Sequence, residues 1–304
     1  MDAVLTYVNG KDEQWLKQYH CFVNVPMNTK RFNDFGTLKY VLRGINSHMP
    51  YIENVYLIVS SLSQVPDYVD TNKVKVVLHE DIIPDKCLPT FNSNVIETYM
   101  WKIEGLSEQF VYLNDDMIPT GYIPDTMLFE NGLPCYMANS YSISYDIENN
   151  CSFYGILKTC NNLARIATGD KGLMGTTSLF YTQHTLTPFL KSDCESCYKK
   201  IERYLLPILT RIRAYNNPSQ FLYSCYSYYL GKYVAKNIKY GFVSIGNTRF
   251  TINDICSEIE NKNNTSVCIN DHSVTLSDDE VSMYVSMVIN SLENVLPNKS
   301  IYEK

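Results

Sequence analysis

The sequence has no excess of positive charge, no long apolar run and only 2 tryptophans among 304 residues. Its formal net charge of −6 argues against a non-specific nucleic-acid-binding protein, whose surface is normally basic. No stretch of about 18 apolar residues occurs, so no transmembrane helix is predicted. The opening residues, Met1 to Trp15, contain no basic segment followed by an apolar one, and no signal peptide is predicted. These absences predict a cytoplasmic protein.

The 10 cysteines do not form the pattern of a disulfide framework. They are scattered along a large chain without a predicted leader, which favours reduced cytosolic thiols. Cys194 and Cys197 have the spacing of a zinc-binding pair, but no second C-x-x-C pair accompanies them. A four-ligand zinc site of that kind is therefore disfavoured.

The first half of the chain alternates short apolar runs with helical patterns, which predicts an α/β fold. Because strands alternate with helices, we expect a mostly parallel, Rossmann-like sheet covered on both faces. Ligands in such folds bind beyond the carboxyl ends of the strands. The predicted strands are Val4–Val8, Val55–Val59, Val74–Leu78 and Phe110–Leu113, and the predicted helices are Asp34–Ser47 and Ile96–Ile103.

The second half has a different composition, with no internal repeat and no low-complexity linker. Residues 131 to 172 are rich in Asn, Tyr, Ser and Gly, which predicts an insertion or lid. Helices are predicted over 199–213, 220–233 and 278–296. We therefore predict a core over 1–130, an insertion or lid over 131–180 and a helical C-terminal part over 181–304, integrated into one domain.

The strongest local signal is Asn114-Asp115-Asp116, directly after a predicted buried strand. Two adjacent carboxylates at a strand end repel each other unless a cation or hydrogen bonds neutralise them. A hard cation such as Mg²⁺ fits this arrangement. A turn or helix cap, which Asn and Asp also favour, explains the same residues without a metal.

Other polar positions carry weaker signals. The first strand ends at Asn9-Gly10, followed by Asp12, where glycine permits either close approach to a nucleotide or simply a turn. His79-Glu80-Asp81 follows another strand and is equally well explained as a polar turn.

In the second half, three features could carry chemistry. His184 has the side chain best suited to act as a general base near neutral pH, although a lone histidine is more often structural. Arg211 and Arg213 could clamp a phosphate or end a solvated helix. Cys268-Ile-Asn-Asp271-His272 is a second junction of apolar and acidic residues and could add a metal ligand.

Taken in order, these segments resemble the Stealth family of sugar-phosphate transferases. The family includes bacterial capsular polysaccharide phosphotransferases and the catalytic subunit of the animal lysosomal-enzyme N-acetylglucosamine-1-phosphotransferase. The most specific region runs from Arg31-Phe-Asn-Asp34 to Tyr112-Leu-Asn-Asp-Asp-Met117. The opening Asp2–Asp12 is also similar, although the family usually has Trp in place of Tyr7. The loop Ser61–Pro66 departs from the family in lacking an Asn-Gly before its Gln.

The resemblance implies a glycosyltransferase-A-like core and transfer of a hexose-1-phosphate or N-acetylhexosamine-1-phosphate from a UDP-sugar to a sugar hydroxyl. UMP would leave, and a phosphodiester of a capsular or cell-surface polysaccharide would form. It implies a Mg²⁺ or Mn²⁺ cofactor. The implied catalytic residues are His184 as base, Arg213 as diphosphate clamp with Arg211 as a substitute, and Asp116. The implied metal residues are Asp115, Asp116 and Asp271, and the implied substrate residues are Asn9, Gly10, Asp12, Arg31, Asp34, Asn92, Glu97 and Asn114.

Two other functions stay open at this point. A conventional metal-dependent glycosyltransferase would share the acidic strand ends but release UDP, and a non-catalytic nucleotide-sugar-binding subunit would release neither nucleotide. The expected partners are the UDP-sugar donor and a glycan or sugar acceptor, with no nucleic acid. Peripheral association with membrane-bound polysaccharide assembly machinery, at the inner face of the membrane, is compatible with the predicted cytoplasmic location.

Overall fold

The computed structural model describes residues 1–23, 32–142, 152–174 and 176–304. Its central sheet consists of β1 (Asp2–Thr6), β2 (Asn54–Val59), β3 (Val74–Leu78), β4 (Gln109–Asn114) and β10 (Thr187–Leu190), in the order β10-β4-β1-β2-β3. β1 to β4 run parallel, and β10 pairs antiparallel with β4. The predicted α/β fold with a mostly parallel sheet is therefore confirmed.

This strand order places a topological switch point between β1 and β4. The chain leaves β1 toward β2 on one side, and its other neighbour, β4, comes from further along the chain. In the β1–β4 pair, Thr6 lies opposite Asn114. Parallel α/β sheets bind ligands outside the carboxyl ends of the strands at such a point. The first ligand-binding position to examine is therefore the edge formed by Thr6, Asn114 and the residues that follow them.

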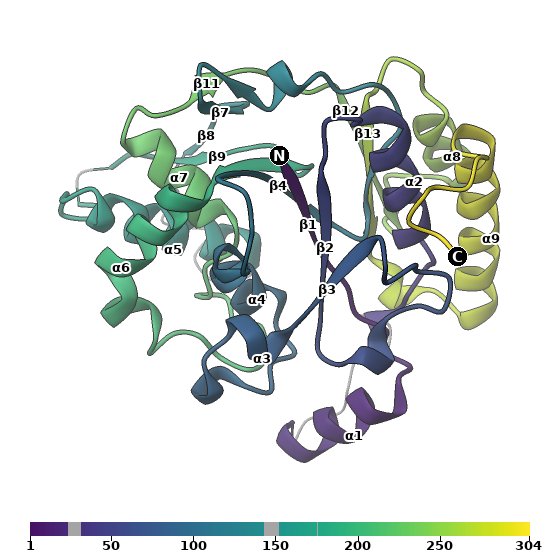
Figure 1. Cartoon of the computed structure of the whole chain (residues 1–304), viewed down its shortest axis with the longest axis horizontal. Helices are drawn as coiled ribbons and strands as arrows, with labels where there is room; N and C mark the ends of the chain where they lie inside the picture. The colour runs from purple at the N-terminus through teal and green to yellow at the C-terminus, as the bar shows by residue number, and fades with distance from the viewer. Residues whose placement is uncertain (24–31, 143–151, 175) are drawn as a thin grey trace.

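Two apolar cores cover the two faces of the sheet, as the alternation of side chains along β1 requires. Val4 packs with residues of α4 (Ser93–Tyr99), α5 (Ser152–Ala167), α6 (Lys191–Leu205) and α7 (Phe221–Tyr229). Ala3 and Leu5 pack with residues of α2 (Leu38–His48), α8 (Ile252–Ile259) and α9 (Asp278–Val295). Figure 1 shows these two groups of helices on opposite sides of the central strands.

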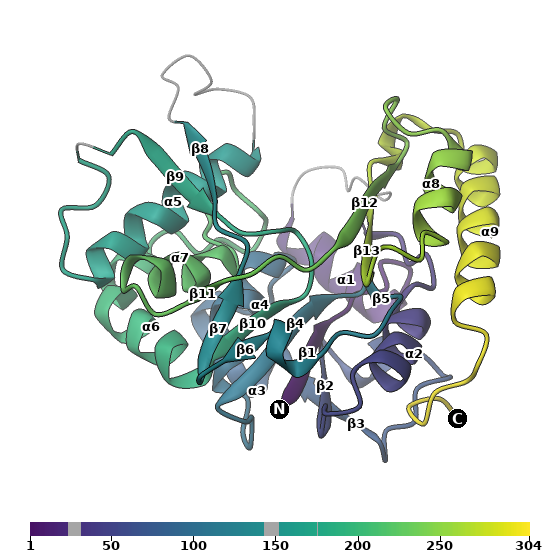
Figure 2. The same cartoon turned by 90° about the horizontal axis from the view of Figure 1, so that it is seen from above.

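A second, smaller sheet continues from the acidic turn. It contains β12 (Tyr240–Ile245), β13 (Ser266–Asp271) and β5 (Met117–Pro119), with β13 between the other two. Figure 2 shows β12 and β13 beside α8 and α9. Because β5 begins directly after Asp116, residues 115 and 116 join the two sheets. Besides short 3-10 turns, the described chain also contains α1 (Glu13–Phe22), α3 (His79–Ile82), β6 (Phe129–Glu130), β7 (Leu133–Tyr136), β8 (Asn139–Ser142), β9 (Ser178–Tyr181) and β11 (Val234–Ala235).

Some predicted elements differ from the structure. The helix predicted over 199–213 is wrong at its end, because α6 covers Lys191–Leu205 and Pro207 cannot continue a regular helix. The segment 131–180 contains α5, whose Leu157 and Cys160 lie fully buried in the core. The C-terminal part contains strands β10, β12 and β13 as well as helices. The lid function of 131–180 stays a prediction.

Candidate functional site

The acidic turn lies at the junction of the two sheets. The N–H of Ile269 donates to the carbonyl of Asp116 at 3.0 Å, and Met117 pairs with Cys268 in the β5–β13 ladder. This pairing brings the end of β13 alongside the turn. Cys268 Sγ lies 3.8 Å from Asp116 Oδ2, and Asp271 contributes its charge to the surroundings of Asp116.

Burial and neighbouring acids disfavour ionisation of both carboxyls in the turn. Loss of hydration raises the pKa of Asp116 to about 6, and the charge of Asp271 acts in the same direction. Burial also raises the pKa of Asp115 well above its ordinary value. The negative charges of Asp116 and Asp34 raise it in the same direction, with smaller effects. A bound cation would remove this penalty, because it offsets the negative charge directly.

His184 meets the acidic turn from the segment before β10. The ligand atoms of Asp116, His184 and Cys268 all lie within 4.8 Å of one another. Burial, together with the positive charge of Arg213, lowers the pKa of His184 to about 4. The imidazole is therefore neutral at pH 7 and can accept a proton.

Arg213 connects the histidine to a buried hydrogen-bond network. Its guanidinium donates to the Ser93 hydroxyl, and its charge acts on both His184 and Glu97. Burial raises the pKa of Glu97, an effect opposed by Arg213 and by the Gln220 N–H, which donates to Glu97 Oε2 at 2.8 Å. Arg213 therefore has two polar neighbours of opposite kinds, an imidazole and a buried carboxyl.

The Tyr112 hydroxyl joins this network to the switch point. It donates to Asn114 Oδ1 at 2.5 Å, lies 2.9 Å from the Thr6 hydroxyl, and lies 3.4 Å from Glu97 Oε1. Asn92, which is 1% exposed, donates to the Thr210 carbonyl and to Asn217 Oδ1, thereby fixing the loop that carries Arg213. The structure thus brings Asn92, Glu97 and Asn114 into the frame around the acidic turn.

The residues after β1 have mainly structural contacts. Asp12 caps α1 by accepting from the Trp15 N–H at 2.7 Å, and Asn9 Oδ1 accepts from the Lys11 N–H. Gly10 is required by close packing, because a Cβ there would lie 2.5 Å from Phe32 atoms. Asp34 differs from these, since its Oδ2 accepts from the Tyr7 hydroxyl at 2.5 Å and its charge reaches Asp115. Arg31 lies outside the described residues.

Arg211 lies in different surroundings from Arg213. Its guanidinium donates to the Leu88 carbonyl at 2.9 Å and lies over the Phe22 ring. Leu88 and Phe22 line a hollow that also includes Trp15 and Phe91. No contact described for Arg211 reaches the acidic turn, so the geometry separates the two arginines that sequence treats as alternatives.

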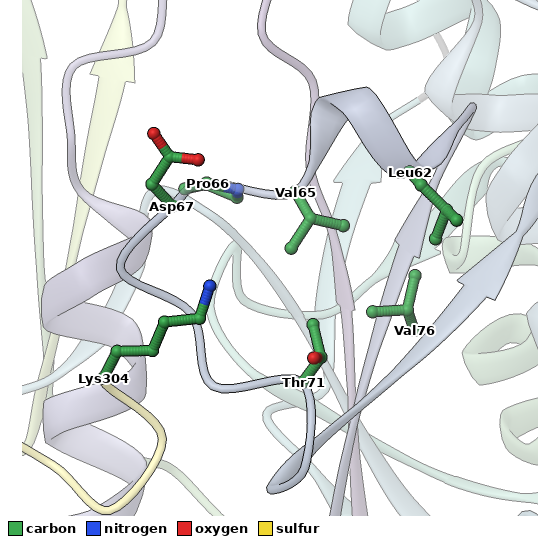
Figure 3. Close-up of a pocket in the computed structure, with 7 residues that line it drawn as sticks. All are labelled: Leu62, Val65, Pro66, Asp67, Thr71, Val76 and Lys304. Carbon is green, nitrogen blue, oxygen red and sulfur yellow. The ribbon is translucent and has the colours of Figure 1, made fainter.

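A separate hollow beside β3, drawn in Figure 3, includes none of the predicted site residues. Its lining consists of Leu62, Val65, Pro66, Asp67, Thr71, Val76 and Lys304. The hollow combines an apolar floor with one charge of each sign, so it has no excess charge for a diphosphate. We therefore place the candidate site at the acidic turn.

Sequence reasoning missed several supporting side chains. Tyr7, Ser93 and Tyr112 each contact a predicted site residue through a hydroxyl. Gln64, which is 1% exposed, accepts from the Asn9 N–H and donates to the Asn9 carbonyl. The available signal was a tyrosine, Tyr112, inside the otherwise non-polar run Phe110–Leu113, because a buried hydroxyl needs a partner.

Comparison with known proteins finds a family match in part of the chain. Residues 31–135 match the family model described as Stealth protein CR2, conserved region 2. The chain is 29% identical to the capsular polysaccharide phosphotransferase WcwK of Streptococcus pneumoniae, over 100% of the chain and 98% of that relative. It is also 38% identical to the exopolysaccharide phosphotransferase cps2G of Lactiplantibacillus plantarum, over 44% of the chain and 41% of that relative.

A structural comparison adds a distant likeness. The crystal structure of the galactosyltransferase LgtC with donor and acceptor sugar analogs covers 97% of this chain at 10% identity, with a TM-score of 0.46. In the described parts of the chain, none of the helices combines the length and the apolar character needed to cross a membrane.

Proposed function

We propose that this protein transfers a sugar-1-phosphate from a UDP-sugar to a sugar hydroxyl in capsular or exopolysaccharide synthesis. The carrying observation is the meeting of a neutral imidazole, a guanidinium and an acidic turn at the switch point of a parallel sheet. Full-length similarity to proteins named polysaccharide phosphotransferases supports the reaction class.

In the proposed reaction, the acceptor oxygen attacks the β-phosphorus of the donor. The bond from that phosphorus to the oxygen bridging the two phosphates breaks, and UMP leaves with the bonding electron pair. His184 takes the proton of the acceptor hydroxyl, which its neutral form permits. Arg213 faces the phosphate oxygens and offsets their negative charge during transfer.

The oxygen-rich turn fits a divalent cation, Mg²⁺ or Mn²⁺. Asp116 Oδ1 is buried and has no hydrogen-bond partner among the described residues, and the neighbouring carboxyls disfavour one another's ionisation. Asp115, Asp116 and Asp271 would hold the ion. When bound, it would offset charge on the diphosphate. Asn114 and Asp34 border this position, and we propose that they contact the donor.

Nucleotide analysis tests the proposal. The protein is incubated with Mg²⁺, a panel of UDP-sugars and a glycan acceptor extract, and the nucleotide released is identified. We expect UMP, with a loss of about 10²–10⁴ in rate for His184→Gln because a general base is removed. His48→Gln, which changes a partly buried histidine on α2, is the matched control and should retain the rate. Release of UDP would mean glycosyl transfer instead, and absence of both nucleotides despite donor binding would favour a binding subunit.

A further inference from the structure

A carboxylate of the acidic turn lies close to an imidazole and a thiol from other segments. Asp116, His184 and Cys268 each offer one ligand atom, and the three atoms lie within 4.8 Å of one another. Ligand atoms around a tetrahedral zinc ion lie about 3.5 Å apart, given metal–ligand distances near 2.0–2.3 Å. Side-chain rotations that move each ligand atom by roughly 1 Å would therefore bring all three atoms within bonding distance of one ion.

The three ligands come from segments that are fixed to one another. Asp116 and Cys268 are held by the β5–β13 pairing, with Cys268 opposite Met117. The segment of His184 is tied to the start of β13, because the hydroxyls of Thr185 and Ser266 lie 2.9 Å apart and both are buried. Such support reduces the movement needed for an ion to bind.

Asp116 supplies a second, independent indication of a ligand. Its Oδ1 is buried without a hydrogen-bond partner among the residues that the structure describes. Buried polar atoms are almost always satisfied by protein, water or an ion. Cys268 is fully buried and supplies the thiol of this three-residue cluster.

The ligand types select the ion. Mg²⁺ takes oxygen ligands and retains waters, whereas a thiol and an imidazole together suit zinc and similar transition metals. We propose that Asp116, His184 and Cys268 form a zinc-binding site with one position open to water. The site overlaps the reaction centre. A consequence, which rests on the proposed function, is that zinc inhibits transfer by occupying His184 and Asp116.

Cobalt(II) provides a direct probe of this site. The chelator-treated full-length chain is titrated with Co²⁺, and absorption is recorded in the near-ultraviolet, where thiolate–Co²⁺ charge transfer occurs, and in the visible. We expect a charge-transfer band and visible bands with the intensity typical of tetrahedral Co²⁺. Zn²⁺ should displace the Co²⁺ and abolish both, whereas excess Mg²⁺ should not. Cys268→Ser should abolish the charge-transfer band and weaken binding about tenfold or more.

Two further variants make the test decisive. Cys135→Ser, which alters a buried thiol outside the cluster, should keep the band. His184→Gln changes a partly exposed side chain on another segment and should weaken Co²⁺ binding even if Cys268→Ser does not fold. A charge-transfer band that persists in Cys268→Ser, or Co²⁺ that binds with only weak octahedral absorption, would overturn the site. Because the titration needs no sugar donor, its failure is distinguishable from failure of the proposed transferase activity.

Discussion

At the scale of single residues, the charge of Asp116 is a local cost to the fold. Its pKa is raised from an ordinary 3.8 to about 6, so the folded state binds the proton more tightly than the unfolded state. The stability associated with the protonated form is complete below about pH 4 and is lost as the pH rises through 6. The proposed cation site would require the charged form, so the proposed function and metal-free stability make opposite demands on this residue.

We predict that Asp116→Asn stabilises the metal-free protein at pH 7 to 8. The gain in free energy of unfolding is up to about 3 kcal/mol, because the amide carries no charge to bury. The difference between variant and parent should grow between about pH 4 and pH 6 and then stay constant. Urea unfolding in the presence of a chelator measures it.

Addition of Mg²⁺ supplies the control for that prediction. The parent should gain stability with Mg²⁺ concentration by mass action, and Asp116→Asn should gain less. Equal stability of both proteins across the pH range would contradict the assigned burial of this charge.

Tyr112 is the second residue at which we predict a measurable effect. Tyr112→Phe removes the hydroxyl that contacts Thr6, Asn114 and Glu97, and leaves the longer Thr6–Asn114 hydrogen bond as the remaining side-chain link of this network. We expect a loss of about 1–3 kcal/mol in stability, measured by urea unfolding. Tyr56→Phe is the matched control, because its hydroxyl makes one bond, to the Gly105 carbonyl, and its removal should cost about 0.5–1.5 kcal/mol. A smaller loss for Tyr112→Phe than for Tyr56→Phe would contradict the importance of the network.

At the scale of elements, the packing of α2 on β5 helps to fix the position of the acidic turn, which directly precedes β5. Gly44 lies in α2, and a Cβ built there would be 2.3 Å from the Pro119 carbonyl oxygen. That oxygen belongs to the backbone of β5 and cannot rotate away. The close approach therefore sets the position of the strand that begins immediately after Asp116.

We predict that Gly44→Ala destabilises the protein although alanine is the better helix former. The propensity gain is about 1 kcal/mol, whereas forcing a methyl group into a packed core costs typically about 1–3 kcal/mol, so a net loss is expected. Ser47→Ala, at an exposed position of the same helix, should be neutral or slightly stabilising. Thermal unfolding compares the two variants. A rise in melting temperature for Gly44→Ala would show that β5 shifts to accommodate the added methyl group.

Sequence patterns predicted two strands closely because these strands are short, nearly continuous apolar runs, whereas the strand predicted over Val4–Val8 lies at Asp2–Thr6. Val74–Leu78 is observed as predicted, and Val55–Val59 lengthens by one residue to Asn54–Val59. The strands β5, β10, β12 and β13 had no predicted counterpart. β5 is three residues long, and β10 contains Pro188, so neither gives a clear alternating or continuous apolar run.

Some of the predicted site residues can be recognised from their immediate neighbours in the sequence, whereas the proximity of others depends on the fold. The Asn114-Asp115-Asp116 turn follows from an apolar strand and adjacent acids, which can be read within a few residues. The nearness of Cys268 and His184 to that turn depends on β5–β13 pairing and on β10, which bring together distant segments. Spacing along the chain also could not separate Arg211 from Arg213, since only the fold determines which one faces His184.

At the scale of the whole molecule, a buried ion network joins α2 to the last helix and the C-terminal segment. The Arg43 guanidinium donates to Glu293 Oε2 at 2.8 Å, to Glu303 Oε1 at 3.1 Å and to the Leu296 carbonyl. The Arg43 side chain is 7% exposed and that of Glu303 is 3% exposed. These contacts connect residues that lie near opposite ends of the sequence.

We predict that Arg43→Ala costs about 3–5 kcal/mol, because it leaves the buried Glu303 carboxylate without a counter-ion, with only the hydrogen bonds from Ser300 remaining. Lys39→Ala removes a partly exposed ion pair with the same Glu293 and should cost about 1 kcal/mol or less. Urea unfolding at constant ionic strength measures both. Comparable costs for the two variants would mean that Glu303 gains access to water when Arg43 is removed.

The pairing of β5 with β13 also has a consequence for the order of events during synthesis. Domains made on the ribosome begin to fold from their N-terminal segments, and β1 to β4 contain the contacts for an early sheet. The strand β13, which carries the proposed metal ligands Cys268 and Asp271, is translated much later, at Ser266–Asp271. Until then, a nascent chain carries the acidic turn without Cys268 or Asp271 beside it. We therefore expect the growing polypeptide to lack the proposed metal sites until translation has passed β13.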